Sequence, residues 1–245
     1  MQNEWQSEIP KITQLTTIAR MKNHTDYIAA KSGDITAAYR FMRGLLGNSQ
    51  QKKIKALGRL YPDAILTGVY AEESTGKNKI PHALVSAVSE FTGIKDDYNI
   101  VQVNRTWHTG NDMAYRLAYR PKFMGTVLAG RDYIVADDVV TSGATLSELR
   151  CYIESMGGKV VHMIVVAAAK FGTHIAVNQE TYFDLESKYG IMPLQLFLKE
   201  QNIYDGSYRY LTEAEARSII SAGSIDAAGD RISQARREGC GRKVT

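Results

Sequence analysis

Cysteine is scarce in this sequence: Cys151 and Cys240 are the two cysteines among 245 residues. They form no CxxC pair and no spacing that would suit a structural metal site. Cys151 falls in a predicted helix and Cys240 in a polar tail, so we expect two free thiols, as in a reducing compartment. This excludes a disulfide scaffold as the basis of the fold.

Long apolar runs are also missing. The longest candidate, residues 160–169, is shorter than the roughly 20 residues that a membrane-spanning helix needs. Residues 1–10 contain acids and amides rather than a basic stretch followed by an apolar one, which does not match a secretory signal. We therefore expect a soluble, cytoplasmic protein without a membrane partner.

No charge of one sign dominates. The formal net charge is +4, with 44% apolar and 23% charged residues, which is ordinary for a globular protein of this length. A mild positive excess suits an anionic small molecule or a nucleic acid equally, so charge alone does not choose between them.

Apolar segments of two kinds alternate in the middle of the chain. Buried strands are predicted at 64–70, 99–104, 133–136 and 159–169, with helices at 81–93 and 145–156. This alternation predicts an α/β fold with a central, mainly parallel sheet flanked by helices. We expect three parts: a helical N-terminal appendage (1–60), the α/β core (61–171) and a helical C-terminal appendage or hood (172–245), in which Thr212 and Glu215 fit a capping box.

The most informative segment is 133–145. Its predicted strand delivers two adjacent acids, Asp137 and Asp138, toward the sheet edge where ligands bind in α/β folds. The small-residue turn 141–145 then opens a helix, whose first N–H groups suit a phosphate. Acids beside a phosphate need hydroxyls or a cation, and a ribose diol with a magnesium ion meets that need.

These residues resemble the phosphoribosyl pyrophosphate motif of type I phosphoribosyltransferases: an apolar strand, two acids, apolar residues, then Thr-Ser-Gly-x-Thr. The resemblance implies the fold of that family, a Mg²⁺ cofactor and a homodimer. It implies that Asp137 and Asp138 hold the ribose hydroxyls. It also implies that the 5′-phosphate is held by Thr141, Ser142, Gly143, Ala144 and Thr145.

The loop 71–79 is at the place of that family's pyrophosphate loop. Lys77 and Lys79 would then bind pyrophosphate oxygens, although Glu72 and Glu73 depart from the pattern and a solvated charged loop is an equal alternative. Thr75-Gly76-Lys77 does not make a nucleotide P-loop, because Ala71 and Asn78 break that motif.

Residues 105–124 are predicted to form a long basic loop, at the place of the family's catalytic loop. Arg105 and Arg116 are the main catalytic candidates, since a basic lid could stabilise the leaving pyrophosphate. His108 is a substrate-binding candidate and proton donor, or a plain surface residue. The layout is similar to the competence-related branch of the family and to phosphoribosyltransferase-like domains of mobile elements.

Two further features bear on the acceptor. Thr141 stands where 6-oxopurine enzymes carry an acid, which argues against a hypoxanthine–guanine enzyme. Tyrosines in the C-terminal part either stack on a base or belong to a core, and the basic residues near the C-terminus either touch nucleic acid or are simply solvated. The residues concerned are Tyr204, Tyr208, Tyr210, Arg236, Arg237, Arg242 and Lys243.

Together these features predict an enzyme of nucleotide metabolism. With magnesium, it would transfer a phosphoribosyl group to or from a nitrogenous base, releasing pyrophosphate, and its ligands would be phosphoribosyl pyrophosphate or a nucleoside monophosphate. The alternative is a non-catalytic regulatory module of the same fold that binds such ligands. Fold alone does not decide between them.

Overall fold

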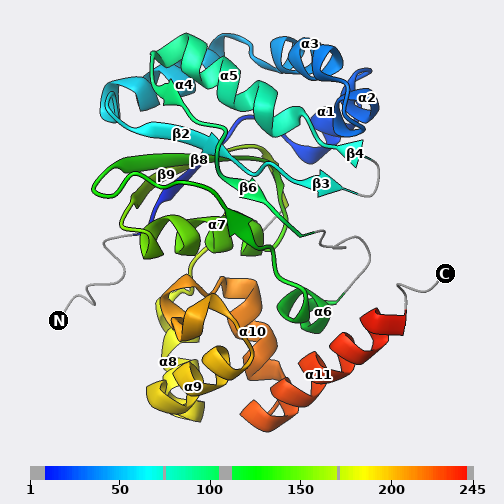
Figure 1. The fold of residues 1–245 in the computed structure, drawn as a ribbon, viewed down its shortest axis with the longest axis vertical. Helices are drawn as coiled ribbons and strands as arrows, with labels where there is room; N and C mark the ends of the chain where they lie inside the picture. The colour runs from blue at the N-terminus through cyan, green and yellow to red at the C-terminus, as the bar shows by residue number, and fades with distance from the viewer. Residues whose placement is uncertain (1–8, 74–75, 105–111, 170–171, 242–245) are drawn as a thin grey trace. The chain divides into compact units, whose positions relative to one another are not determined.

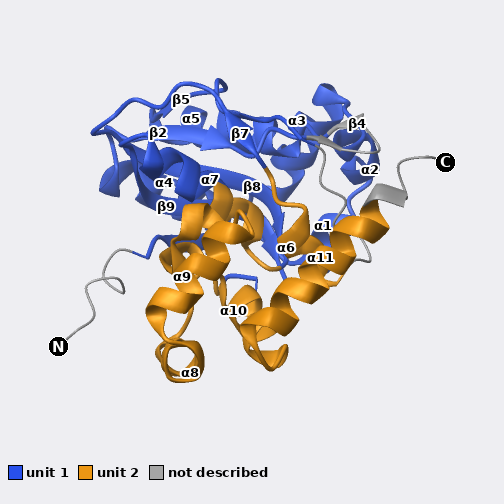
Figure 2. Ribbon diagram, turned by 60° about the horizontal axis from the view of Figure 1, so that its bottom comes forward, with its two compact units in different colours: residues 1–105, 122–141, 149–173 blue, residues 106–121, 142–148, 174–245 orange. Residues whose placement is uncertain are grey.

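The computed structural model describes residues 9–73, 76–104, 112–169 and 172–241. The chain divides into two compact units (Figure 2): unit 1 comprises residues 1–105, 122–141 and 149–173, and unit 2 comprises 106–121, 142–148 and 174–245. The boundaries at 60 and 171 that the sequence suggested remain predictions.

Unit 1 is built on a five-stranded sheet in the order β1-β9-β8-β2-β5. All neighbouring strands of this sheet are parallel. Such a sheet is covered on both faces, and the four residues of β2 are all buried. The predicted mainly parallel sheet flanked by helices is therefore confirmed. Its strands are β1 (Lys11–Gln14), β2 (Ile65–Gly68), β5 (Lys95–Asp96), β8 (Asp132–Val140) and β9 (Lys159–Ala168).

Helices cover the sheet on its two faces (Figure 1). Helices α3 (Ile35–Leu45), α4 (Asn48–Leu60) and α5 (Ile80–Thr92) lie on one face, and α7 (Ala144–Ser155) lies on the other. Helix α5 ends at Gly93, whose φ of +75° favours glycine. Two short helices, α1 (Ile18–Lys22) and α2 (Tyr27–Lys31), precede α3 and add Met21 and Ala30 to the buried core.

One predicted strand and one segment predicted to be helical differ from the structure. The strand expected at 99–104 reduces to β6 (Val101–Gln102), which pairs antiparallel with β7 (Phe123–Met124) outside the main sheet. Residues 11–14, expected to be helical, form β1, because β9 offers them a parallel hydrogen-bonding edge. The short ribbon β3 (Glu72–Glu73) with β4 (Gly76–Lys77) occupies the loop after β2.

Unit 2 is helical. The predicted capping box is confirmed, since Thr212 Oγ1 accepts from the N–H of Glu215, and the N–H of Thr212 donates to Glu215 Oε2 at 2.9 Å. Part of the segment expected to be a structureless loop is helical, because Asp112 caps it by accepting from the N–H of Tyr115. Its elements are α6 (Met113–Ala118), α8 (Gln179–Tyr189), α9 (Ile191–Glu200), the 3-10 turns η2 (Tyr204–Gly206) and η3 (Tyr208–Tyr210), α10 (Glu213–Ser221) and α11 (Ile225–Gly241). None of the helices in the described ranges is long and apolar enough to cross a bilayer.

Candidate functional site

The two predicted acids lie within a central strand. Strand β8 extends to Val140, so Asp137 and Asp138 are part of it rather than following it, which corrects the expected strand end at 136. They are 7% and 5% exposed. Two adjacent carboxylates this deeply buried need compensating partners, because burial disfavours charge strongly.

Asp138 has such partners in unit 1. Lys31 Nζ donates to its Oδ2 at 3.0 Å, and Asn78 Nδ2 donates to the same oxygen at 2.8 Å. The N–H of Val139 donates to Oδ1 at 2.7 Å. Burial alone would raise the pKa of Asp138, but the charge of Lys31 and the hydrogen bonds from Lys31, Asn78 and Val139 outweigh it and lower that pKa.

Asp137 is held differently. Its Oδ1 accepts the N–H of Asp138 at 2.8 Å. Burial and then the neighbouring charge of Asp138 raise the pKa of Asp137 well above its ordinary value. The surroundings therefore shift the two pKa values in opposite directions, lowering that of Asp138 and raising that of Asp137.

Lys31 and Asn78 were not among the predicted site residues. Asn78 is 4% exposed, and its Oδ1 accepts the N–H of Ile80 at 3.1 Å at the start of α5. The N–H of Lys79 donates to the carbonyl of Ala30 at 3.1 Å, which joins the end of α2 to this loop. No local pattern signals either contact, since Lys31 is 107 and Asn78 60 residues from Asp138.

The turn after β8 has the predicted form. Gly143 has φ +84°, and α7 begins at Ala144. The carbonyl of Gly143 accepts the N–H of Ser147 at 3.0 Å. The first N–H groups of a helix have no intrahelical acceptor, and anions can bind to such groups. Thr141 is exposed, Thr145 is half-buried, and Ser142 is buried.

The remaining predicted residues are distributed as follows. Arg105 and His108 lie outside the described residues, as does the side chain of Lys77. Lys79 immediately precedes α5 in unit 1. Arg116 lies in the last turn of α6 in unit 2. Their predicted roles stay predictions.

Two residues of interest in unit 2 have structural partners. Arg120, within the expected basic loop, pairs with Glu148 and Glu215 and lies over the ring of Tyr204. Tyr204 is 2% exposed and donates its hydroxyl to Glu215 Oε2 at 2.9 Å. Tyr204 is thus a core residue. Of the two alternatives, stacking on a base or belonging to a core, the second holds for Tyr204.

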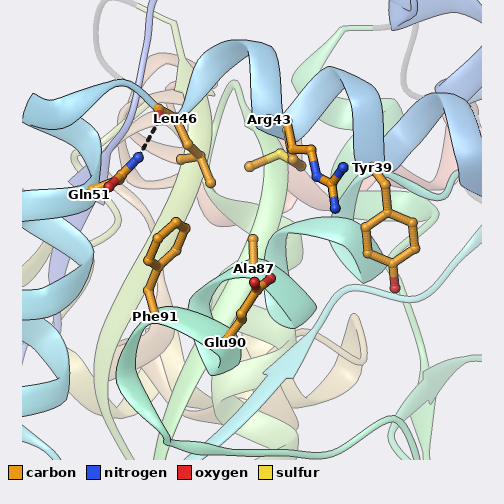
Figure 3. Close-up of a pocket in the computed structure, with 8 residues that line it drawn as sticks. Tyr39, Arg43, Leu46, Gln51, Ala87, Glu90 and Phe91 are labelled. Atoms are coloured by element: carbon orange, nitrogen blue, oxygen red, sulfur yellow. Dashed lines mark hydrogen bonds between the residues drawn. The ribbon is translucent and has the colours of Figure 1, made fainter.

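A cavity of about 230 Å³ lies elsewhere in unit 1, between α3, α4 and α5 (Figure 3). It includes none of the predicted site residues. Its lining mixes apolar side chains with the polar or charged residues Arg43, Gln51 and Glu90. Its lining consists of Tyr39, Met42, Arg43, Leu46, Gln51, Ala87, Glu90 and Phe91.

Comparison with known proteins gives relatives at the sequence level. The chain is 34% identical to protein TraN of Escherichia coli over 240 residues, which is 96% of this chain and 52% of TraN. It is also 34% identical over 166 residues to an uncharacterised protein of Haemophilus influenzae, covering 67% of this chain and 36% of that protein. The chain therefore spans about half or less of these relatives. No protein-family model matches it.

Among solved structures, the chain is similar to several phosphoribosyltransferases. An adenine phosphoribosyltransferase is 12% identical, with a TM-score of 0.36, and the match covers 59% of this chain and 75% of the chain of that enzyme. The orotate phosphoribosyltransferase of Aeropyrum pernix is 16% identical, with a TM-score of 0.33 over 55% of this chain and 67% of its own. The purine phosphoribosyltransferase of Pyrococcus horikoshii is 18% identical, with a TM-score of 0.33 over 51% of this chain and 86% of its own.

Proposed function

We propose that this chain binds phosphoribosyl pyrophosphate and transfers its phosphoribosyl group to a nitrogenous base. The observation that carries the proposal is the pair Asp137 and Asp138, buried side by side on the central strand and followed within a few residues by the Gly143 turn and the start of α7. A buried acid pair is costly to keep and suits a ligand with adjacent hydroxyls.

In the proposed reaction, a ring nitrogen of the base attacks C1 of the ribose. The nitrogen–carbon bond forms, the bond from C1 to the pyrophosphate oxygen breaks, and the nitrogen loses its proton. Asp137 and Asp138 orient the ribose through its hydroxyls, and the turn 141–145 holds the 5′-phosphate. Holding the reacting groups in place removes much of the entropic part of the barrier.

A magnesium ion fits this site as a companion of the ligand. Carboxylate oxygens suit Mg²⁺, which commonly uses one or two carboxylates together with substrate phosphates. In the described ranges no three His, Cys, Asp or Glu side chains gather to form a protein-built metal site, so the ligand's own oxygens would supply most of the coordination. When bound, the ion would offset the negative charge that grows on the leaving pyrophosphate.

The basic residues Arg105, Arg116, Lys77 and Lys79 are proposed to act on the pyrophosphate, with His108 as a substrate-binding residue. We also propose a homodimer, and membership of the competence-related or the mobile-element branch of the phosphoribosyltransferases. Sedimentation analysis tests the homodimer, and a predominantly monomeric protein would contradict it.

A second candidate is a regulatory module that binds the same ligand without transfer. Arg120, a basic residue within the segment 105–124, pairs with two glutamates. This leaves one cation fewer in the 105–124 segment for the leaving group and favours the second candidate at that one point.

Calorimetry with phosphoribosyl pyrophosphate and Mg²⁺, followed by a pyrophosphate-release assay with a panel of bases, separates the two. Binding with release supports the enzyme, and tight binding without release on the whole panel supports the module. The double variant Asp137→Asn with Asp138→Asn should lose binding. Asp132→Asn, an exposed acid at the start of the same strand, is the matched control and should retain it. If the wild-type protein binds neither phosphoribosyl pyrophosphate nor ribose 5-phosphate, both candidates fail.

A further inference from the structure

The carboxylate of Asp138 is held from several sides. Its Oδ2 accepts from Lys31 at 3.0 Å and from Asn78 at 2.8 Å, and its Oδ1 accepts the N–H of Val139 at 2.7 Å. A carboxylate oxygen has about two acceptor positions. Lys31 and Asn78 therefore occupy both acceptor positions of Oδ2, which holds the carboxylate in place.

Lys31 is the last residue of helix α2, which packs against α3. In α2, Tyr27 and Ala30 are buried, and the ring centroid of Tyr27 lies 6.1 Å from that of Phe41 on α3. The carbonyl of Ala30 accepts the N–H of Lys79. The side chain of Lys31 is 30% exposed and the side chain of Asp138 is 8% exposed, so a partly exposed lysine pairs with a buried acid.

Asn78 is equally fixed. It is buried, and its side-chain oxygen accepts the N–H of Ile80 while its nitrogen donates to Asp138. This orientation of the amide follows from the two bonds together, since only the nitrogen can donate to a carboxylate.

We propose that Lys31 and Asn78 are positioning residues of the sugar-phosphate site, which hold the carboxylate of Asp138 toward one hydroxyl of the bound ribose. This rests on the proposed function. The carboxyl group of Asp137 hydrogen-bonds the second hydroxyl. The charge of Lys31 beside Asp138 adds a positive potential that favours an anionic ligand. The N-terminal helix α2 thereby becomes part of the binding site.

The test measures binding of three sugars by calorimetry: ribose 5-phosphate and its 2-deoxy and 3-deoxy counterparts. Lys31→Met should weaken ribose 5-phosphate about tenfold, as expected when a hydrogen bond to a charged group loses its support. One of the two deoxy sugars lacks the hydroxyl that Asp138 holds. For that sugar, Lys31→Met should change the affinity less than about twofold. Asn78→Leu should show the same selectivity, and Lys31→Arg should restore most of the affinity.

Lys22→Met is the matched control, since Lys22 is an exposed lysine at the end of the neighbouring helix α1, and it should leave all three affinities unchanged. Equal losses for the three sugars in Lys31→Met would reveal a purely structural role and overturn the inference, as would an unchanged affinity for ribose 5-phosphate. A wild-type protein that binds neither ribose 5-phosphate nor phosphoribosyl pyrophosphate would instead overturn the proposed function itself.

A measurement on the wild-type protein covers the case in which the variants do not fold. Acetylation of lysines, read by mass spectrometry with and without ribose 5-phosphate, should show protection of Lys31 and none of Lys22. Equal reactivity of Lys31 in both states would overturn the inference.

Discussion

The guanidinium of Arg120 donates from Nη1 to Oε1 of Glu215 at 2.6 Å, and the two side chains are 6% and 0% exposed. The same guanidinium pairs with Glu148 and lies 4.0 Å from the ring centroid of Tyr204. Burial raises the pKa of Glu148 despite the opposing charge of Arg120. Arg120 therefore compensates two acids that would be costly to bury alone.

We predict that Arg120→Met lowers the free energy of unfolding by about 3–5 kcal/mol, because it leaves buried carboxylates without their cation. Urea unfolding followed by circular dichroism measures this. Arg237→Met, an exposed arginine on α11, should change the value by less than about 0.5 kcal/mol. A loss below about 1 kcal/mol in Arg120→Met would contradict the assigned role.

Gly143 gives a second prediction. A Cβ at this position would require a φ of +84° and would lie 2.8 Å from Cγ2 of Ile175. Gly130 has a similar φ of +72°, but a Cβ there meets nothing within 4 Å. Gly130→Ala should therefore cost about 1 kcal/mol for the backbone alone, and Gly143→Ala should cost at least about 1 kcal/mol more, because of the contact with Ile175.

Thermal unfolding of the two alanine variants, compared with the wild-type protein, measures the difference. Equal losses of stability would show that Ile175 moves aside at no cost. If the turn also holds a phosphate, Gly143→Ala should weaken ribose 5-phosphate binding while Gly130→Ala does not.

Some elements of the fold could be predicted from the sequence, and others could not. Strand β9, helix α5 with Gly93 at its end, and the Thr212 capping box were predicted correctly, because their signals are local: an apolar run, helical spacing or a residue pair three positions apart. The acid pair and the turn after it were also found locally. Strands β1 and β5 have four and two residues, too few for a periodic pattern, and their partners lie far away in the chain.

The partners of Asp138 were missed for the same physical reason. The contact of Lys31 with Asp138 depends on the packing of α2 against α3 and on its backbone link to Lys79, and no short pattern encodes either. Helix α6 was missed although Asp112 is a suitable N-cap, since one cap and a six-residue helix give a weak signal.

His162 provides a pH-dependent prediction. It lies on β9, hydrogen-bonds through Nε2 to Thr13 Oγ1 on β1 at 2.9 Å, and is 6% exposed. Burial, and then the charge of Lys11, lower the pKa of His162 to about 4, whereas an unfolded histidine titrates near 6.5. The unfolded state therefore binds the proton first as the pH falls, and the stability present above about pH 6.5 is lost progressively down to about pH 4.

The expected loss due to His162 is roughly 1 kcal/mol per pH unit within that window. Urea unfolding at pH 7, 6 and 5 should show a shallower loss in His162→Gln than in the wild-type protein. His174→Gln, at an exposed histidine, should keep the wild-type slope. Identical slopes in the wild-type protein and His162→Gln would mean that His162 is protonated as easily in the fold as in the unfolded chain.

The two acids of β8 should respond in opposite ways to the same substitution. Burial and the charge of Asp138 raise the pKa of Asp137 in the fold, so its contribution to stability is present below the unfolded value of about 3.9 and is lost as the pH rises. Asn imitates the protonated acid, and Asp137→Asn should leave stability at pH 7 unchanged or raise it.

The pKa of Asp138 is lowered, so the contribution of Asp138 to stability is present above its unfolded value of about 3.9. Asp138→Asn removes the charge that pairs with Lys31 and should cost about 1–3 kcal/mol. Urea unfolding of both variants at pH 7 measures the difference, and a larger loss in Asp137→Asn than in Asp138→Asn would reverse the assignment of charge within the pair.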